Sequence, residues 1–215
     1  MKAIYPSLIS ADLLHLGDVI KTFNPICDGF HIDIMDNHFV PNLTWGAAFA
    51  NTITAASKNP TWVHLMVDNP EKWLPILQLT PGSTLSFHIE NSLDKNQAIR
   101  SIREKKLKPS IAISPKTALE EILPFAHLVD QILIMSVEPG FSGQNFMPEV
   151  MTKIAPLVQM RTEKKLHFTI AMDGGIDATN INMLAQKGVD QFAAAKAIFG
   201  QPDPVAAYEA LKKLT

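Results

Sequence analysis

Short apolar runs of strand length alternate with amphipathic stretches along the whole chain. The apolar runs predict eight strands, at residues 3–8, 29–35, 61–67, 84–88, 108–113, 131–137, 167–172 and 189–195. The amphipathic stretches predict helices near 12–23, 45–57, 70–79, 92–105, 117–123, 147–163, 177–187 and 203–213. Strands that alternate with helices pair in parallel, because a parallel pair requires a crossover connection. The pattern therefore predicts an α/β protein with a parallel sheet.

The number of units favours a closed barrel. The 215 residues leave about 27 for each of eight units, enough for a strand, a helix and two short loops. No Ser/Gly-rich linker or shift in composition interrupts the pattern. We therefore expect residues 1–215 to form a single (β/α)8 TIM-barrel domain.

The predicted strand at 29–35 places polar side chains where a buried strand would be apolar. His31 and Asp33 share one face, and Ile32 and Ile34 share the other. The polar face could lie in water or face a site. Other polar or polarizable residues lie on or just after further strands: Ser7, His64, Met66, His88, Met135 and Asp173. A single histidine is more often structural, but this recurrence near the carboxyl ends of barrel strands indicates a site.

Two histidines and two carboxylates in this set could bind a metal. They are His31, Asp33, His64 and Asp173. Mixed imidazole and carboxylate ligands suit Zn²⁺, Fe²⁺, Mn²⁺ or Co²⁺ better than Mg²⁺. The sequence has no HExxH or CxxC motif, so spacing alone leaves both a metal site and ordinary structural roles open.

Glycine-rich segments follow two of the last strands. EPGFSGQ (138–144) follows the sixth strand, and DGG (173–175) follows the seventh. In βα-barrels, loops in this region commonly bind phosphate through backbone N–H groups. Many glycines only supply positive φ angles, but the position of these segments beside Asp173 favours a phosphate site.

Composition and charge narrow the choice of partners. The formal net charge is −2 and the pI is about 6.4, so no basic field indicates nucleic acid. No apolar run is long enough for a membrane span, and the first residues lack a signal-peptide core. A single cysteine, Cys27, fits a reducing compartment. We expect a cytoplasmic protein that binds neither nucleic acid nor membranes.

Seven blocks of sequence resemble one enzyme family. They are PSLISADLLHLGD (6–18), FHIDIMDNHFVPNLTWG (30–46), VHLMV (63–67), FHIE (87–90), MSVEPGFSGQNFMPEVMTKI (135–154), MDGGIDATNI (172–181) and AIFG (197–200). Through these blocks the chain resembles the ribulose-phosphate 3-epimerase family from end to end. The resemblance implies a ribulose-phosphate-binding barrel and an isomerase of the pentose phosphate pathway. This enzyme would interconvert D-ribulose 5-phosphate and D-xylulose 5-phosphate by inverting C3.

The resemblance also implies roles for individual residues. One divalent metal, Zn²⁺ or Fe²⁺ first and Mn²⁺ or Co²⁺ as alternatives, would be held by His31, Asp33, His64 and Asp173. Asp33 and Asp173 would be the catalytic acid and base. Substrate contacts would come from Ser7, Met35, His64, Met66, Met135, Gly140, Phe141, Ser142, Gly143, Gly174, Gly175, Ala195 and Lys196. We also expect a homo-oligomer that acts on a phosphorylated ketose.

The chemistry explains these residue types. The C3 proton lies beside the C2 ketone, so it can leave if charge on the enediolate oxygens is stabilised by a metal. Inversion needs one carboxylate on each face, one ionised and one protonated. Methionines would contact the planar intermediate without offering a proton.

The chain departs from the family pattern at several positions. Asn37 and Ser142 replace usual glycines, and Asn37 should be tolerated because asparagine accepts left-handed backbone geometry. Ala195 and Lys196 stand where the family has a Gly-Ser pair. Lys196 could bind the substrate phosphate as a point charge or point into solvent with weaker phosphate binding, and we favour the phosphate contact.

Three functions stay open from the sequence. The first is the pentulose 5-phosphate epimerase, and the second is the same chemistry on a longer ketose phosphate such as D-allulose 6-phosphate. The third is a catalytically silent sugar-phosphate-binding barrel, which the intact candidate ligands disfavour. Decarboxylases on related barrels usually carry a DxKxxD motif. The corresponding segment here, DIMDNH (33–38), has no lysine, so decarboxylation is disfavoured.

Overall fold

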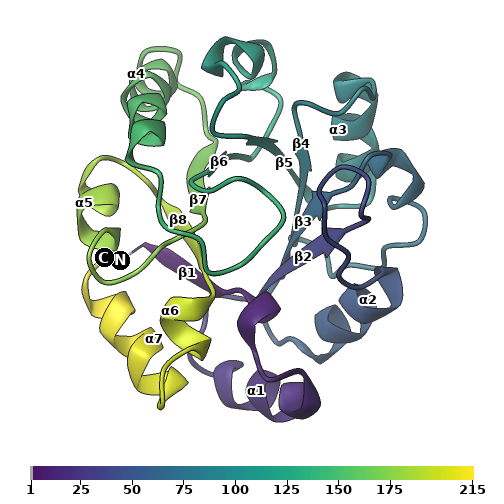
Figure 1. Cartoon of the computed structure of the whole chain (residues 1–215). Coiled ribbons are helices and arrows are strands. Elements are labelled where there is room, and N and C mark those ends of the chain that lie inside the picture. Colours follow the sequence, from purple (N-terminus) through teal and green to yellow (C-terminus); the bar gives the residue numbers. More distant parts are fainter. Residues whose placement is uncertain (1) are drawn as a thin grey trace.

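Eight parallel strands form one sheet in the computed structural model, which describes residues 2–215 (Figure 1). They are β1 (Ala3–Pro6), β2 (His31–Met35), β3 (Trp62–Met66), β4 (Thr84–His88), β5 (Lys108–Ile113), β6 (Gln131–Met135), β7 (Thr169–Asp173) and β8 (Gln191–Ala194). From β2 to β8 each strand pairs with the next in chain order, and β8 pairs with β1. A parallel bridge between Ser7 and His31 joins β1 to β2. The sheet closes into the predicted barrel, and every strand lies within two residues of its predicted bounds.

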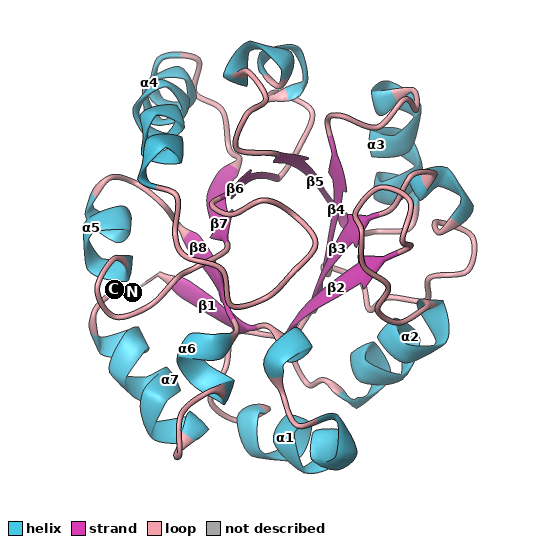
Figure 2. Ribbon diagram, viewed as in Figure 1, coloured by secondary structure: helices cyan, strands magenta, loops and turns pink. Residues whose placement is uncertain are grey.

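Helices form a ring around the outside of the barrel (Figure 2). The α-helices are α1 (Leu16–Phe23), α2 (Ala47–Ala56), α3 (Lys95–Glu104), α4 (Ile154–Glu163), α5 (Ile181–Gln186), α6 (Lys196–Phe199) and α7 (Pro204–Lys213). Short 3-10 helices are η1 (Leu8–Ser10), η2 (Leu13–His15), η3 (Pro70–Lys72), η4 (Leu119–Glu121), η5 (Leu123–Phe125) and η6 (Pro148–Lys153). None of the helices in residues 2–215 has the length and apolar character needed to cross a membrane.

Two predicted helices are wrong. The segment 70–79 contains only the short η3, because Pro75 interrupts the helical pattern that its apolar residues suggest. The segment 117–123 forms η4 and part of η5 instead of an α-helix, since Pro124 removes a backbone donor there. The four-residue helix α6 was not predicted, because it is shorter than a helical period can reveal.

Local capping explains where the well-predicted helices begin. The side chain of Asp94 accepts a hydrogen bond from the backbone N–H of Gln97 at 3.1 Å, which caps α3. Asp203 caps α7 in the same way through Ala206 at 3.0 Å, and Pro204 occupies the first helical position. These caps end the loops and set where each helix packs against the barrel.

The interior of the barrel is filled below its open end. Apolar side chains such as Trp62 and Leu133 pack there. The indole N–H of Trp62 donates to Ser86 Oγ at 2.7 Å, and Ser110 Oγ donates to Gln131 at 2.6 Å. These buried polar groups hydrogen-bond one another, so they can be buried in this packed layer. A ligand-binding site can therefore form at the carboxyl ends of the strands, above this packed layer.

Candidate active site

Strand β2 carries two candidate metal ligands into the barrel. His31 and Asp33 are two residues apart and point inward, whereas Ile32 and Ile34 belong to the outer core between strands and helices. His31 is 0% exposed and Asp33 is 3% exposed. The polar face of this strand therefore does not lie in water.

The other two candidate ligands converge on the same point. His64 on β3 is in register with Asp33 on β2, so their side chains are neighbours. Asp173 ends β7, which lies across the sheet from β2 and β3. One nitrogen or oxygen atom from each of His31, Asp33, His64 and Asp173 lies within 4.8 Å of those of the other three. The structure thus brings together all four residues predicted as ligands.

Hydrogen bonds orient the side of this cluster formed by β1 and β2. Ser7 Oγ donates to Asp33 Oδ2 at 3.0 Å and lies 3.0 Å from His31 Nδ1. Because the serine proton is directed to Asp33, the hydroxyl oxygen accepts from His31 Nδ1–H. The other nitrogen, His31 Nε2, faces Asp173 Oδ2 at 3.8 Å and has no hydrogen-bond partner although it is buried.

His64 faces the cluster through its Nδ1 atom. This nitrogen is 3.2 Å from Asp33 Oδ1 and 3.5 Å from Asp173 Oδ2. The opposite nitrogen, Nε2, is 2.9 Å from His88 Nε2. His88 in turn contacts Glu90 through its own Nδ1 at 3.0 Å.

The two carboxylates favour a positive charge at this point. Burial disfavours the charged form of Asp33, but the charge and hydrogen bond of His31 and the hydrogen bond of His64 outweigh it. The pKa of Asp33 is held well below its usual range. Burial opposes a charge on His64 as well, yet hydrogen bonds with Asp173 and Asp33 raise its pKa to about 9. The favoured positive charge is a proton on His64 or a metal ion in its place.

The donor set fits a divalent metal ion. Two imidazole nitrogens and two carboxylates are ligands that Zn²⁺ and Fe²⁺ accept. The unpartnered, buried His31 Nε2 is the atom that an ion would satisfy. A buried His/Asp group that could hold a metal is therefore present, and its residues do not distinguish between these ions.

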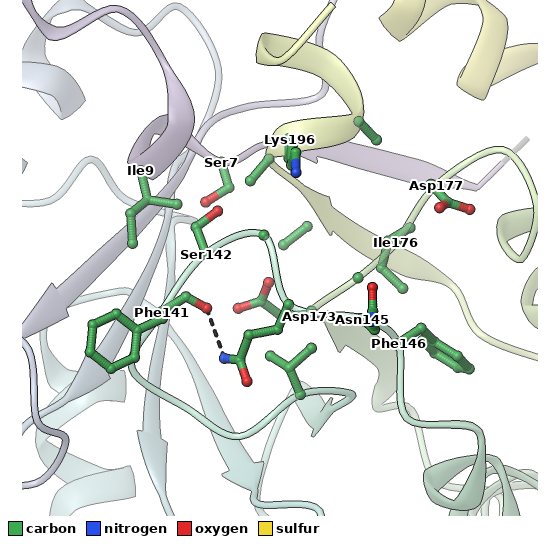
Figure 3. Close-up of a pocket in the computed structure, with 18 of the residues that line it drawn as sticks. Ser7, Ile9, Phe141, Ser142, Asn145, Phe146, Asp173, Ile176, Asp177 and Lys196 are labelled. Carbon is green, nitrogen blue, oxygen red and sulfur yellow. Dashed lines mark hydrogen bonds between the residues drawn. The ribbon is translucent and has the colours of Figure 1, made fainter.

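A cavity of about 830 Å³ opens above the cluster. The predicted methionines line it together with Asp33 and Asp173. Met35 and Met66 pack against each other, while Met135 belongs to the barrel interior. Figure 3 shows Asp173 near the middle of this pocket, with Ser7 and Lys196 above it in the view. His31 and His64 lie beneath the pocket and do not line it.

The loop after β6 crosses the mouth of the barrel (Figure 1). Two contacts hold it there: Asn42 Nδ2 donates to the carbonyl oxygen of Gly140 at 2.7 Å, and the hydroxyls of Ser10 and Ser142 are 2.7 Å apart. Gln144 Nε2 donates to the carbonyl oxygen of Phe141 at 2.9 Å, the dashed line in Figure 3. The predicted residues Gly140, Phe141, Ser142 and Gly143 all line the pocket.

Gly174 and Gly175 line the pocket beside this loop. Gly174 has φ +114°, and a Cβ there would lie 2.5 Å from a methyl carbon of Val137. Gly175 has φ +64°, and a Cβ there would lie 2.5 Å from the backbone nitrogen of Phe146. Both positions therefore require glycine. Asn37 adopts φ +57°, as expected for an asparagine in place of glycine.

The segment that departs most from the family pattern also lies on the pocket. Ala195 and Lys196 line it where β8 leads into α6. Lys196 is exposed, and its Cδ lies 3.5 Å from where a Cβ on Gly143 would be. Its stem thus runs beside the loop after β6, and its ammonium group is available to a ligand in the pocket.

Sequence reasoning missed several residues of this region. His88 was noted only as a polar strand end, and Glu90 received no role although both lie in the block FHIE. Asn145 and Asn180 line the pocket and were not predicted. For Asn180 the backbone explains its place: its Nδ2 donates to the carbonyl oxygen of Gly175 at 2.8 Å. No periodic signal marks such loop residues.

Comparisons with known proteins relate this chain to one enzyme family. Residues 3–199 match the model of the ribulose-phosphate 3 epimerase family. A ribulose-phosphate 3-epimerase from Mycobacterium bovis is 39% identical over 210 residues, covering 98% of this chain and 91% of the relative. The cytoplasmic isoform from Oryza sativa subsp. japonica is 37% identical, covering 98% and 92%. Among solved structures, KGPDC from Streptococcus mutans superposes with a TM-score of 0.72 at 12% identity, covering 100% and 97%, a likeness of fold alone.

Proposed function

This chain belongs to the ribulose-phosphate 3-epimerase family, and we propose that it inverts C3 of D-ribulose 5-phosphate to give D-xylulose 5-phosphate. The observation that carries the proposal is the buried cluster of His31, Asp33, His64 and Asp173, which lies directly under a pocket lined by methionines. We further propose a cytoplasmic homo-oligomer, in agreement with the name of the rice relative for its location.

Asp33 and Asp173 are the proposed pair of proton-transfer residues. They come from β2 and β7, two strands that β1 and β8 separate in the barrel, and both line the pocket. A planar substrate carbon between them would have one carboxylate on each face, which inversion requires. One carboxylate removes the C3 proton, and the other, protonated, delivers a proton to the opposite face. Their roles exchange when the reaction runs backwards.

The two aspartates differ in their surroundings. Both oxygens of Asp33 accept hydrogen bonds, from Ser7 and from His64, and its charged form is stabilised. Asp173 Oδ2 faces His31 and His64, and its side chain is 16% exposed, against 5% for the side chain of Asp33. These contacts hold the carboxylates at fixed positions, which supports proton transfer between defined atoms.

A divalent ion held by His31, Asp33, His64 and Asp173 would act as a Lewis acid that stabilises negative charge on the substrate oxygens. The protein residues do the rest. Met35, Met66 and Met135 give the pocket an aprotic wall, which offers no proton to the intermediate. The loop after β6, held by contacts with Asn42 and Ser10, covers part of the pocket from above.

The phosphate is proposed to bind at the other end of the pocket. Gly174 and Gly175 bring backbone close to the cavity without a side chain in the way. Lys196, at the start of α6 and next to Gly143, adds a positive charge to the same pocket. The lysine charge replaces the hydroxyl donor that the family usually provides, and we propose that it contacts the phosphate directly.

Turnover with two substrates tests this function. Protein stripped with a chelator and reloaded separately with Zn²⁺, Fe²⁺, Mn²⁺ and Co²⁺ is incubated with D-ribulose 5-phosphate and with D-allulose 6-phosphate. We expect metal-dependent formation of D-xylulose 5-phosphate at the higher kcat/KM. A higher kcat/KM for D-allulose 6-phosphate would mean that the chain performs the same reaction with the hexulose phosphate as its preferred substrate. Binding without turnover on either substrate, in every metal form, would indicate a silent barrel.

A further inference from the structure

A row of hydrogen bonds leads from His64 away from the proposed metal site. His64 Nε2 is 2.9 Å from His88 Nε2, and His88 Nδ1 is 3.0 Å from Glu90 Oε2. The other carboxylate oxygen, Glu90 Oε1, accepts the backbone N–H of Ser114 at 2.8 Å. Both histidines are 0% exposed, so water does not supply alternative partners.

The far end of this row fixes the direction of every bond in it. The backbone N–H of Ser114 can only donate, and the carboxylate of Glu90 can only accept. His88 must therefore donate from Nδ1, which leaves its Nε2 as the acceptor of a neutral imidazole. His64 must then donate from Nε2. A neutral His64 consequently has its lone pair on Nδ1, the atom that faces Asp33 and Asp173.

We propose that Glu90 and His88 are positioning residues that hold His64 with its Nδ1 lone pair directed at the metal site. The inference rests on the proposed metal-dependent function, because it concerns how one ligand of that metal is prepared. Metal-bound histidines commonly donate their other N–H to a carboxylate or carbonyl group. Here His88 lies between the carboxylate of Glu90 and His64, so Glu90 fixes the proton position on His64 through one additional imidazole ring.

Packing keeps both rings in the geometry that this requires. The rings of His64 and His88 stack with centroids 5.1 Å apart and an interplanar angle of 22°. Phe39, from the loop after β2, lies against His88 at 4.8 Å. The row therefore cannot reverse by a ring flip without displacing these neighbours.

A buried lysine secures the turn at the end of the row. Lys153 Nζ donates to the carbonyl oxygens of Ser114, Pro115 and Thr117 at 2.8, 2.9 and 2.8 Å. The turn 114–117 supplies the N–H that Glu90 accepts. Its position is thus set by η6, an element outside the pocket that contributes Lys153.

The substitution Glu90→Gln tests the direction of the row without changing its shape. Ser114 N–H still needs an acceptor, so the glutamine oxygen turns to Ser114 and its NH2 group turns to His88. His88 then accepts at Nδ1 and carries its proton on Nε2, facing His64. His64 must accept at Nε2, which places its proton on Nδ1, where a metal would bind.

Two measurements follow the effect. Titration of Zn²⁺ against a competing chelator should show affinity about 10- to 100-fold weaker than wild type. Nitrogen-15 NMR of histidine-labelled, metal-free protein, at a pH above the pKa of His64, should show His88 protonated on Nδ1 in wild type and on Nε2 in the variant. A purely structural role for Glu90 would not exchange these two tautomers.

Glu163→Gln is the matched control. It removes one carboxylate charge at the end of α4, where Glu163 accepts a hydrogen bond from Gln159 at 2.8 Å instead of from a histidine. Its Zn²⁺ affinity and His88 tautomer should match wild type. Equal weakening in both variants, or an unchanged His88 tautomer in Glu90→Gln, would overturn the proposal. Zn²⁺ affinity and the His88 tautomer are both measured without turnover. A failure of this proposal can therefore be told apart from a failure of the proposed epimerase activity.

Discussion

Single residues decide the chemistry of this site, and the alternation of strand β2 already revealed two of them. The side-chain period of two placed His31 and Asp33 on one face, and ionisable residues on the inner face of a barrel strand are hard to explain without a site. Asp173 was found by its place after β7. Glu90 was not found, because its part depends on which atoms meet across three elements, and a linear sequence does not contain that information.

Lys196 is a positively charged residue that lines the pocket. We expect Lys196→Ala to raise KM for the phosphorylated sugar about 10-fold or more while kcat changes less, because a charge-assisted phosphate contact is worth about 1.5–3 kcal/mol. Steady-state kinetics provide the measurement. Lys164→Ala, just after α4 and not among the residues that line the pocket, is the control. An unchanged KM in Lys196→Ala would place the lysine in solvent.

Protons and metal should compete for His64. Its pKa of about 9 in the metal-free protein means that it is protonated at neutral pH and must lose that proton to bind an ion. Raising the pH towards 9 removes the competing proton, so apparent affinity should rise by up to about tenfold per pH unit. Titrations with Co²⁺ between about pH 6 and 8 measure this slope. A flat profile would contradict the raised pKa or the role of His64 as a ligand.

Whole elements were predicted well where the sequence carries a period and poorly where proline interrupts it. All eight strands were placed within two residues, since short apolar runs between turn residues are distinctive. The helices at 70–79 and 117–123 failed because Pro75 and Pro124 prevent regular α-helical bonding. The loop after β6 was identified by its glycines, but its contacts with Asn42 and Ser10 come from tertiary structure.

The turn after β7 depends on glycine at position 174. Gly174→Ala should destabilise the fold by about 1–3 kcal/mol or more, because a Cβ there meets Val137 at 2.5 Å and φ is +114°. Gly17→Ala is the control: it lies in α1 with nothing within 4 Å of the new Cβ, and should be neutral or stabilising. Urea unfolding measures both. Equal stability of the two variants would argue against strain at position 174.

At the scale of the whole molecule, the proposed metal would tie together distant parts of the chain. Its ligands lie on β2, β3 and β7, so an ion would bind the folded barrel and not the unfolded chain. At about 100 times its Kd, the ion should stabilise the protein by about 2.7 kcal/mol and raise Tm by about 5–10 °C. Calorimetry of stripped and reloaded protein tests this, and His64→Gln should lose most of the shift. Identical Tm values would contradict a metal site in this cluster.

Deuterium exchange at C3 tests the central claim most directly. Metal-loaded protein in D₂O should place deuterium at C3 of D-ribulose 5-phosphate while D-xylulose 5-phosphate forms, since the removed proton is replaced from solvent. Asp33→Asn and Asp173→Asn should each reduce this by at least about 10²-fold, with metal content measured in parallel because both residues are proposed ligands. NMR and mass spectrometry locate the deuterium. Wild-type protein that incorporates none, or an Asp173→Asn variant that turns over normally, would contradict proton transfer by this pair.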